Sequence, residues 1–230
     1  MKRLRILLPT LLFVAIMAGC GQTPKTQDEI SIIAMNSMYN EKTGQTVSLD
    51  MDQDTIEEQL GKGTEHELAL FGADTTLIPY TVISDVQYIS YGTGEDFIVV
   101  TYQGDTPTAI SSCGNFSNVK PGPSHWSIKY GLSYGASMND IVANYGAGET
   151  LPLAPTQESA KTGEGYLNTP SANWEAPILV SYYYDKDYNP LNDVADENVL
   201  YQLTFIVDEK QDGLMWYTVS YGVNVPISDK

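Results

Sequence analysis

The sequence predicts an α+β fold of two tandem modules, each a short helix packed on a small antiparallel β-meander. Two observations predict it: the helix pattern of residues 47–65 returns at residues 130–150, and β-branched and aromatic runs follow each copy. Gly, Pro and Asp turns close those runs, as in strand–turn–strand segments. The duplication matters because one such sheet could hardly bury its face alone.

The two helix patterns align when the first is shifted forward by 85 residues. The shift places Ser48 on Ser133, Asp52 on Ser137, Ile56 on Ile141, Leu60 on Tyr145, Gly61 on Gly146 and Gly63 on Gly148. Asp52 and Ser137 are typical N-caps, because a short side-chain oxygen accepts from the free N–H groups of the first turn. Gly61 and Gly146 are typical of the left-handed residue that ends a helix. Each copy therefore predicts a capped helix of about two to three turns.

Three strands are expected after each helix. After the first helix they are Val86–Tyr91, Asp96–Tyr102 and Thr108–Ser111. After the second they are Ile178–Tyr184, Leu200–Val207 and Leu214–Gly222. The turns between them carry sequences such as QGDTP and DEKQDG, which favour hairpins.

This order of features resembles a known repeat. A small polar residue, an apolar residue, a helix-ending Gly and a strand meander are similar to the SmpA/BamE-like repeat. Two in tandem resemble the beta-lactamase-inhibitory-protein-like architecture and Gram-positive lipoproteins that carry the repeat twice. The likeness covers most of Val47 to Gly222, with two departures: glycines stand near the place of the usual Pro after each helix, and Trp126–Tyr130 has a strand pattern where the repeat has a helix. The resemblance implies a binding scaffold rather than an enzyme, and it assigns no functional residues.

The N-terminus indicates export and lipid anchoring. Lys2, Arg3 and Arg5 form a basic segment, and the apolar run Leu7–Met17 that follows is too short for an ordinary spanning helix. The run ends in Met-Ala-Gly-Cys20, which looks like the lipobox of bacterial lipoproteins. We expect residues 1–19 to be a cleaved signal peptide and Cys20 to carry lipid, since each buried methylene adds about 0.8 kcal/mol of membrane affinity. The chain would then sit on the extracytoplasmic face of the cell membrane. The alternative is an ordinary signal peptide in which Cys20 is incidental.

The expected domains follow from the loops. Residues 20–45 are a lipidated tether, in which Ile30–Met38 is either a weakly held helix or disordered. Residues 46–115 are the first module and residues 116–230 the second, with the boundary in the Gly-, Pro- and Asn-rich segment Cys113–Ser124. A second loop, Leu151–Trp174, is long enough to suggest a binding edge, and a mobile insertion is the other interpretation.

The charge balance restricts the classes of partner. Without its basic N-terminal segment the chain has nine lysines, no arginine and 29 acidic residues, a net charge of −20. Arg is the preferred reader of phosphate and of guanine, so nucleic acid and anionic lipid headgroups are poor partners. A cationic partner or divalent cations fit better, unless the acidity serves only solubility.

No catalytic motif is present. The histidines are His66 and His125, and the only thiol besides Cys20 is Cys113. A Cys113–His125 pair is conceivable, but no family signature surrounds it, so we assign no catalytic residue and no cofactor. Asp185, Asp187, Asn189, Asp193 and Asp196 occupy positions 1, 3, 5, 9 and 12 of a calcium-loop frame. Pro at position 6 and Asp at position 12 depart from that frame, so a solvated hairpin loop is the default and no metal is assigned.

The aromatic residues suggest a binding surface. Tyr182, Tyr183 and Tyr184 alternate between the faces of their strand, so at least one ring should face away from the core. Together with Tyr166 and Trp174 of the long loop, they are the candidate binding residues, because Tyr and Trp supply contact area at small entropic cost. Rings half-covered by neighbouring strands are the other reading of the same pattern. We expect a non-catalytic binding or scaffold module for an envelope protein or a cell-wall component. The alternatives are an inhibitor of a secreted enzyme and a carboxylate-based envelope enzyme.

Overall fold

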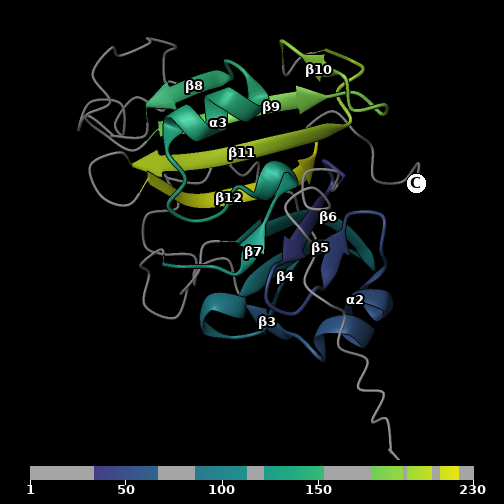
Figure 1. Ribbon diagram of the computed structural model, residues 1–230. Helices are drawn as coiled ribbons and strands as arrows, with labels where there is room; N and C mark the ends of the chain where they lie inside the picture. The colour runs from purple at the N-terminus through teal and green to yellow at the C-terminus, as the bar shows by residue number, and fades with distance from the viewer. Residues whose placement is uncertain are drawn as a thin grey trace, which may run out of the picture.

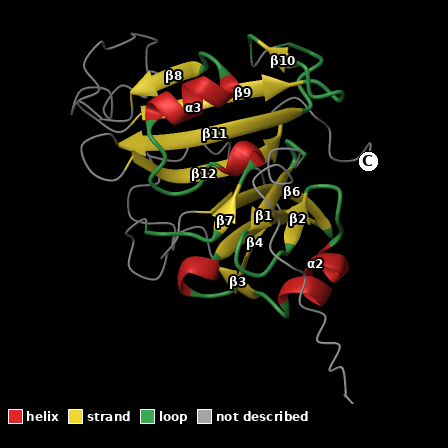
Figure 2. Cartoon of the chain, viewed as in Figure 1, coloured by secondary structure: helices red, strands yellow, loops and turns green. Residues whose placement is uncertain are grey.

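The structure is a computed structural model that describes residues 34–66, 86–112, 122–152, 178–193, 196–208 and 213–222. Within these ranges strands dominate (Figures 1 and 2). The strands are β1 (Ser37–Asn40), β2 (Thr46–Ser48), β3 (Thr64–His66), β4 (Val86–Tyr91), β5 (Ile98–Gln103), β6 (Thr106–Ser112), β7 (Trp126–Ser127), β8 (Glu149–Pro152), β9 (Ile178–Tyr184), β10 (Pro190–Leu191), β11 (Tyr201–Asp208) and β12 (Gly213–Tyr221). The α-helices are α2 (Gln53–Leu60) and α3 (Met138–Tyr145), and 3-10 turns lie at Gly94–Asp96 and Lys129–Gly131. Neither α-helix is long and apolar enough to cross a membrane.

The expectation of two helix-on-meander modules is wrong. The described strands form two sheets, one of three strands and one of nine, and the nine-stranded sheet continues across the predicted module boundary. Its order is β10-β9-β11-β12-β6-β5-β4-β3, with β8 also paired to β9. The reason is the edge strand: a three-stranded meander ends in unpaired N–H and C=O groups. Strands β6 and β12 satisfy each other by antiparallel pairing, so the two meanders become one sheet.

The two halves of the large sheet correspond in register. Each half has a bulge at the equivalent place. In the pairing of β5 with β6, one residue of β6 has no partner opposite Thr101–Tyr102. In the pairing of β11 with β12, one residue of β12 has no partner opposite Ile206–Val207. At the centre, Ser111 pairs with Thr218, and Ile110↔Val219 and Ser112↔Tyr217 flank that pair symmetrically. The Ser111 and Thr218 hydroxyls lie 2.9 Å apart. A pseudo-two-fold axis therefore passes through this pair.

Both predicted helix ends are confirmed. The Asp52 carboxylate accepts from the N–H of Thr55 at 2.8 Å, and the Ser137 hydroxyl accepts from the N–H of Asp140 at 3.2 Å. The Asp140 carboxylate accepts in return from the Ser137 N–H at 2.8 Å, which completes a capping box. Each helix stops at a glycine of positive φ, 83° at Gly61 and 81° at Gly146.

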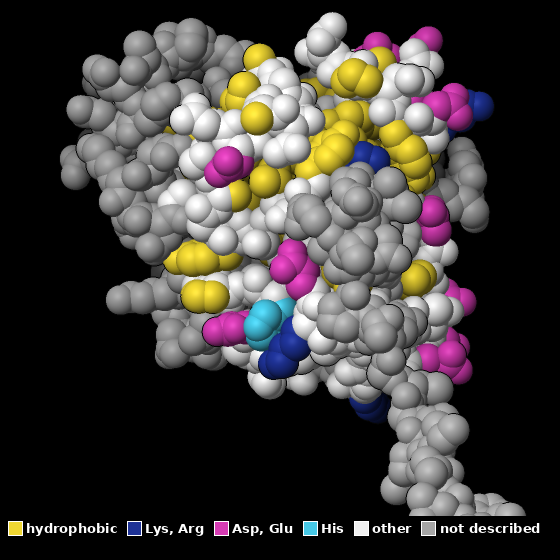
Figure 3. Space-filling model, viewed as in Figure 1, with side chains coloured by type: hydrophobic (Ala, Val, Ile, Leu, Met, Phe, Trp, Pro, Cys, Tyr) yellow, Lys and Arg dark blue, Asp and Glu magenta, His cyan; other side chains and the backbone are white. Residues whose placement is uncertain are grey.

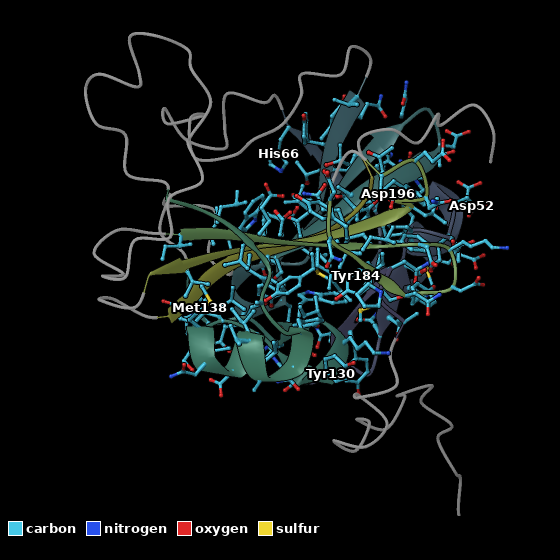
Figure 4. The ribbon with its side chains drawn as sticks, turned by 90° about the horizontal axis from the view of Figure 1, so that it is seen from above. Asp52, His66, Tyr130, Met138, Tyr184 and Asp196 are labelled. Carbon is cyan, nitrogen blue, oxygen red and sulfur yellow. The ribbon has the colours of Figure 1, made fainter. Side chains whose placement is uncertain are left out.

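One core lies between the large sheet and the elements on its front face. Helices α2 and α3 and the small sheet β2-β1-β7 all cover this face (Figure 1). Ile56 of α2 and Ile141 of α3 are fully buried, and each such burial contributes about 1.5–3 kcal/mol. In the view from above, Met138 and Tyr130 lie on this side of the sheet and His66 lies on the other (Figure 4).

The small sheet corrects two expectations. Strand β1 lies inside the predicted tether, and its Met38 and Tyr39 are fully buried. The helix expected at Ile30–Met38 is therefore wrong at its described end. Strand β1 pairs with β2 on one side and β7 on the other and is buried along its whole length. In such a fully buried segment, the spacing of apolar residues does not distinguish a helix from a strand. The strand expected at Trp126–Tyr130 forms only as far as Ser127. Beyond it Tyr130 adopts a φ of 69° in a 3-10 turn.

A candidate binding groove at the edge of strand β9

A groove of about 570 Å³ lies along the outer edge of β9. Strand β8 covers the first part of that edge, where Glu149–Pro152 pairs with Ile178–Ser181. Strand β10 covers the last part, where Pro190 and Leu191 pair with Tyr184 and Tyr183. The groove is the interval between these two short strands. On this face of the molecule, side chains of the hydrophobic class, which includes Tyr, gather between the α3 region and the β10 region (Figure 3).

The turn before β10 is held by one carboxylate. Asp185 Oδ1 accepts from the N–H groups of Asp187 at 2.8 Å and Asn189 at 2.9 Å, and its Oδ2 accepts from the Asn189 side-chain amide at 2.9 Å. These hydrogen bonds from Asn189 lower the pKa of Asp185. Tyr188 takes a φ of 62° inside the turn. The first ligand position of the calcium-loop frame thus serves as a turn cap, and the described residues bring no three acidic, His or Cys side chains into a metal-binding group.

The three tyrosines of β9 alternate as the sequence predicted, but none presents an open ring face. Tyr182 and Tyr184 face the core, and Tyr183 faces the opposite side of the sheet. The exposed fraction is 6% for Tyr182 and Tyr183 and 4% for Tyr184. One ring does face away from the core, as expected, but it is not exposed to solvent. The ring of Tyr182 packs against Tyr145, 5.3 Å away, and against Phe205, 5.8 Å away. These residues offer the groove hydroxyl groups and ring edges.

The hydroxyl groups differ in their partners. The Tyr145 hydroxyl donates to the Lys129 carbonyl at 2.7 Å, Tyr182 donates to the Gly146 carbonyl at 2.9 Å, and Tyr183 donates to Glu149 Oε2 at 2.7 Å. The Tyr184 hydroxyl has no hydrogen-bond partner in the part of the chain that the structure describes, and Tyr184 lines the groove. Burial raises the pKa of Tyr184. It therefore remains a phenol that can donate and accept.

The charged residues that line the groove are acidic. They are Glu149 and Asp193, and the described lining contains no Lys, Arg or His. Burial, then the Glu149 carboxylate and then the Asp193 charge raise the pKa of Tyr183, so its hydroxyl stays protonated and donates to Glu149. The groove is an acceptor-rich, negatively charged depression.

The internal correspondence of the sheet explains where the groove comes from. Strands β4 and β5 are joined by residues 92–97, while their counterparts β9 and β11 are joined by residues 185–200. The longer connection contributes β10, Asn192 and Asp193 to the groove. Glu149 and Asn192 carry no sequence signal of their own, because each is a single polar residue that occupies no position of a motif. A comparison of connection lengths between the two aligned copies would have found the added segment.

Several residues named from the sequence lie outside the described residues. They are Cys20, Cys113, Tyr166 and Trp174. His125 is described and its ring is fully engaged: Nδ1 lies 2.8 Å from Asp96 Oδ1, and Nε2 lies 2.9 Å from Glu95 Oε2. Asp96 also contacts Lys42 at 3.3 Å, so His125 ties the 3-10 turn of Gly94–Asp96 to β7.

The other histidine sits on the far side of the sheet. His66 Nε2 lies 2.6 Å from the Ser90 hydroxyl, across the pairing of β3 with β4. A catalytic pair of this kind needs a third group that orients the imidazole. No such contact to the second ring nitrogen of His66 is found among the described residues. His66 therefore serves to join β3 to β4 through a hydrogen bond with Ser90.

Comparison with family models, with curated proteins and with solved structures found no match to this chain. The groove itself therefore carries the functional argument.

Proposed function

We propose that the protein is a non-catalytic binding module for a component of the cell envelope, held on the extracytoplasmic face of the membrane by lipid on Cys20. The observation that supports binding is the groove at the β9 edge. Its volume of about 570 Å³ falls within the range of about 300–1,000 Å³ that is usual for ligand sites.

The groove is built on a rigid support. Strand β9 is paired along one side by β11 and along the other by β8 and β10. The β9 residues that line the groove are therefore held in place before any ligand arrives, which lowers the entropic cost of binding. Function then depends on the few polar groups that converge there.

The anchor is supported by the sequence alone. The basic segment, the short apolar run and Met-Ala-Gly-Cys20 are the features of a lipoprotein signal. Metabolic labelling with radioactive palmitate tests this directly. Label is expected in the wild-type chain and absent from Cys20→Ser, and a wild-type chain that stays unlabelled would rule out the anchor.

Capture from envelope extract tests the binding role. The mature chain with Cys20→Ser is the bait, beside two variants that place the same bulky side chain at exposed alanines. Ala147→Trp fills the groove, and Ala143→Trp lies on the exposed face of α3 outside it. A binding module is expected to retain a component that Ala143→Trp also retains and that Ala147→Trp loses.

The nature of the captured component separates the alternatives. If it is an enzyme whose activity falls in a stoichiometric complex, the protein is an inhibitor rather than a scaffold. Capture that is equal for both tryptophan variants would refute the assignment of the groove as the binding site.

A further inference from the structure

We infer that His125, Glu95 and Asp96 form a proton-dependent clamp, which holds the small sheet to the connection between β4 and β5 more firmly in weak acid than in weak base. All three residues lie outside the β9 groove. The clamp follows from the number of hydrogen atoms that its two ring contacts need, which is one more than a neutral imidazole carries.

Both nitrogens of the His125 ring contact a carboxylate. Nδ1 lies 2.8 Å from Asp96 Oδ1, and Nε2 lies 2.9 Å from Glu95 Oε2. An ionised carboxylate only accepts hydrogen bonds, and a neutral imidazole has a single N–H. The neutral ring can therefore donate to one carboxylate, while its other nitrogen presents a lone pair to a negative oxygen. Only the imidazolium donates to both.

Glu95 is the partner that the neutral ring releases. Asp96 has two further donors, the Asn40 side-chain amide at 3.2 Å and the Lys42 ammonium at 3.3 Å. Among the described residues, the His125 ring is the one side-chain donor to the Glu95 carboxylate. The Glu95 side chain is also 54% exposed, against 34% for Asp96, so water can replace the ring there. Deprotonation therefore opens the contact between Nε2 and Glu95.

The rest of this junction does not depend on the proton. The N–H of His125 donates to the Glu95 carbonyl at 2.8 Å, and the Trp126 indole N–H donates to the Asp96 carbonyl at 2.9 Å. On the other side, the N–H of Glu41 donates to the His125 carbonyl at 2.8 Å. These bonds keep β7 beside the connection and beside β1 while the ring is neutral. Loss of the proton thus loosens the junction without separating the two sheets.

The direction of the pH dependence follows from the charges around the ring. Of the described charged side chains, Glu95 and Asp96 contact it, and the Lys42 ammonium lies beyond Asp96 Oδ2. Two negative groups in contact favour the charged ring. Carboxylates are ordinarily ionised above about pH 4, and imidazole ordinarily loses its charge between about pH 5 and 8. The clamp is therefore complete in weak acid and is lost as the pH rises through the imidazole range.

Glu95→Gln tests the clamp, because a Gln amide can accept from the ring or donate to it. The variant suits the neutral ring as well as the charged one. The assay is urea unfolding of the mature chain with Cys20→Ser, at about pH 5.5 and about pH 8.5, on either side of the imidazole range. At the lower pH the variant is expected to raise the unfolding equilibrium constant about two- to fivefold, as for loss of an exposed ion pair. At the higher pH the constant should stay the same or fall.

Two further variants assign that difference to the ring. Glu58→Gln removes a carboxylate from the exposed side of α2 and should act equally at both pH values. In a His125→Gln background, Glu95→Gln should lose its dependence on pH. His66 is common to all these chains, so its own titration cancels in each comparison.

An equal effect of Glu95→Gln at the two pH values would overturn the clamp. So would a pH-dependent effect that Glu58→Gln reproduces, or one that persists without His125. If His125→Gln does not fold, the comparison of Glu95→Gln with Glu58→Gln at the two pH values still decides.

Discussion

Truncation of one buried isoleucine in each half of the molecule tests whether the sheet folds as a single unit. Ile56 and Ile141 occupy corresponding helix positions, are both 0% exposed and belong to one core. Replacing a buried Ile by Ala costs about 2–5 kcal/mol. At about 3 kcal/mol the expected fall in Tm is about 6–12 °C for a chain of this length. Since β6 and β12 join the halves, either variant should lower the same unfolding transition.

Differential scanning calorimetry is the assay, with Val142→Ala as control because Val142 is 43% exposed on α3. The control should stay within about 0.5 kcal/mol of the wild type. Two separate transitions, with Ile56→Ala lowering one and Ile141→Ala the other, would refute the single continuous sheet as the unit of folding.

Three further predictions concern the caps, the glycines and the His125 cluster. Ser137→Ala and Asp52→Ala should each lose about 1 kcal/mol of stability in urea unfolding, because each removes the acceptor of a first-turn N–H. Gly148→Ala should cost about 1–3 kcal/mol by the same measurement, since its new Cβ would lie 2.9 Å from the Ser181 carbonyl oxygen; a variant as stable as the wild type would contradict this close approach. Burial raises the pKa of Asp96, but hydrogen bonds from Asn40, His125 and Lys42 outweigh it and leave the pKa lowered. A lowered carboxyl pKa stabilises the fold above the unfolded value and loses that effect in acid, so the stability gap between wild type and Asp96→Asn should shrink as pH falls below about 4.

Local features of the fold could be predicted from the sequence because local chemistry decides them. The caps at Asp52 and Ser137 and the stops at Gly61 and Gly146 depend on residues within a few positions, and all four are as predicted. The six strands of the two meanders were also predictable, since their apolar and turn residues are contiguous, whereas β1 falls partly in a segment predicted as a helix or a disordered linker. The joining of β6 to β12 was not, because pairing between distant edges leaves no periodic signal in either segment.

The candidate groove was only partly predictable. Tyr182, Tyr183 and Tyr184 drew attention by composition, but their burial depends on which strands and helices cover them. Glu149 and Asp193 are two carboxylates in a chain with 29 acidic residues, so composition could not single them out. Only the pairing of β8 and β10 with the same strand brings them to one place.

A chain cut after β6 would expose a strand whose outer N–H and C=O groups lack partners. The pairing of β6 with β12 is symmetric about Ser111 and Thr218, which occupy equivalent positions in the two halves. The β6 edge of a second N-terminal half could therefore pair with β6 in the way that β12 does. Half-length chains are therefore expected to associate as a symmetric dimer through β6. Gene duplication and fusion would join the two copies of such a dimer in the present single chain. Once the copies no longer had to be identical, one could acquire the long connection between β9 and β11 while the other kept the short turn between β4 and β5.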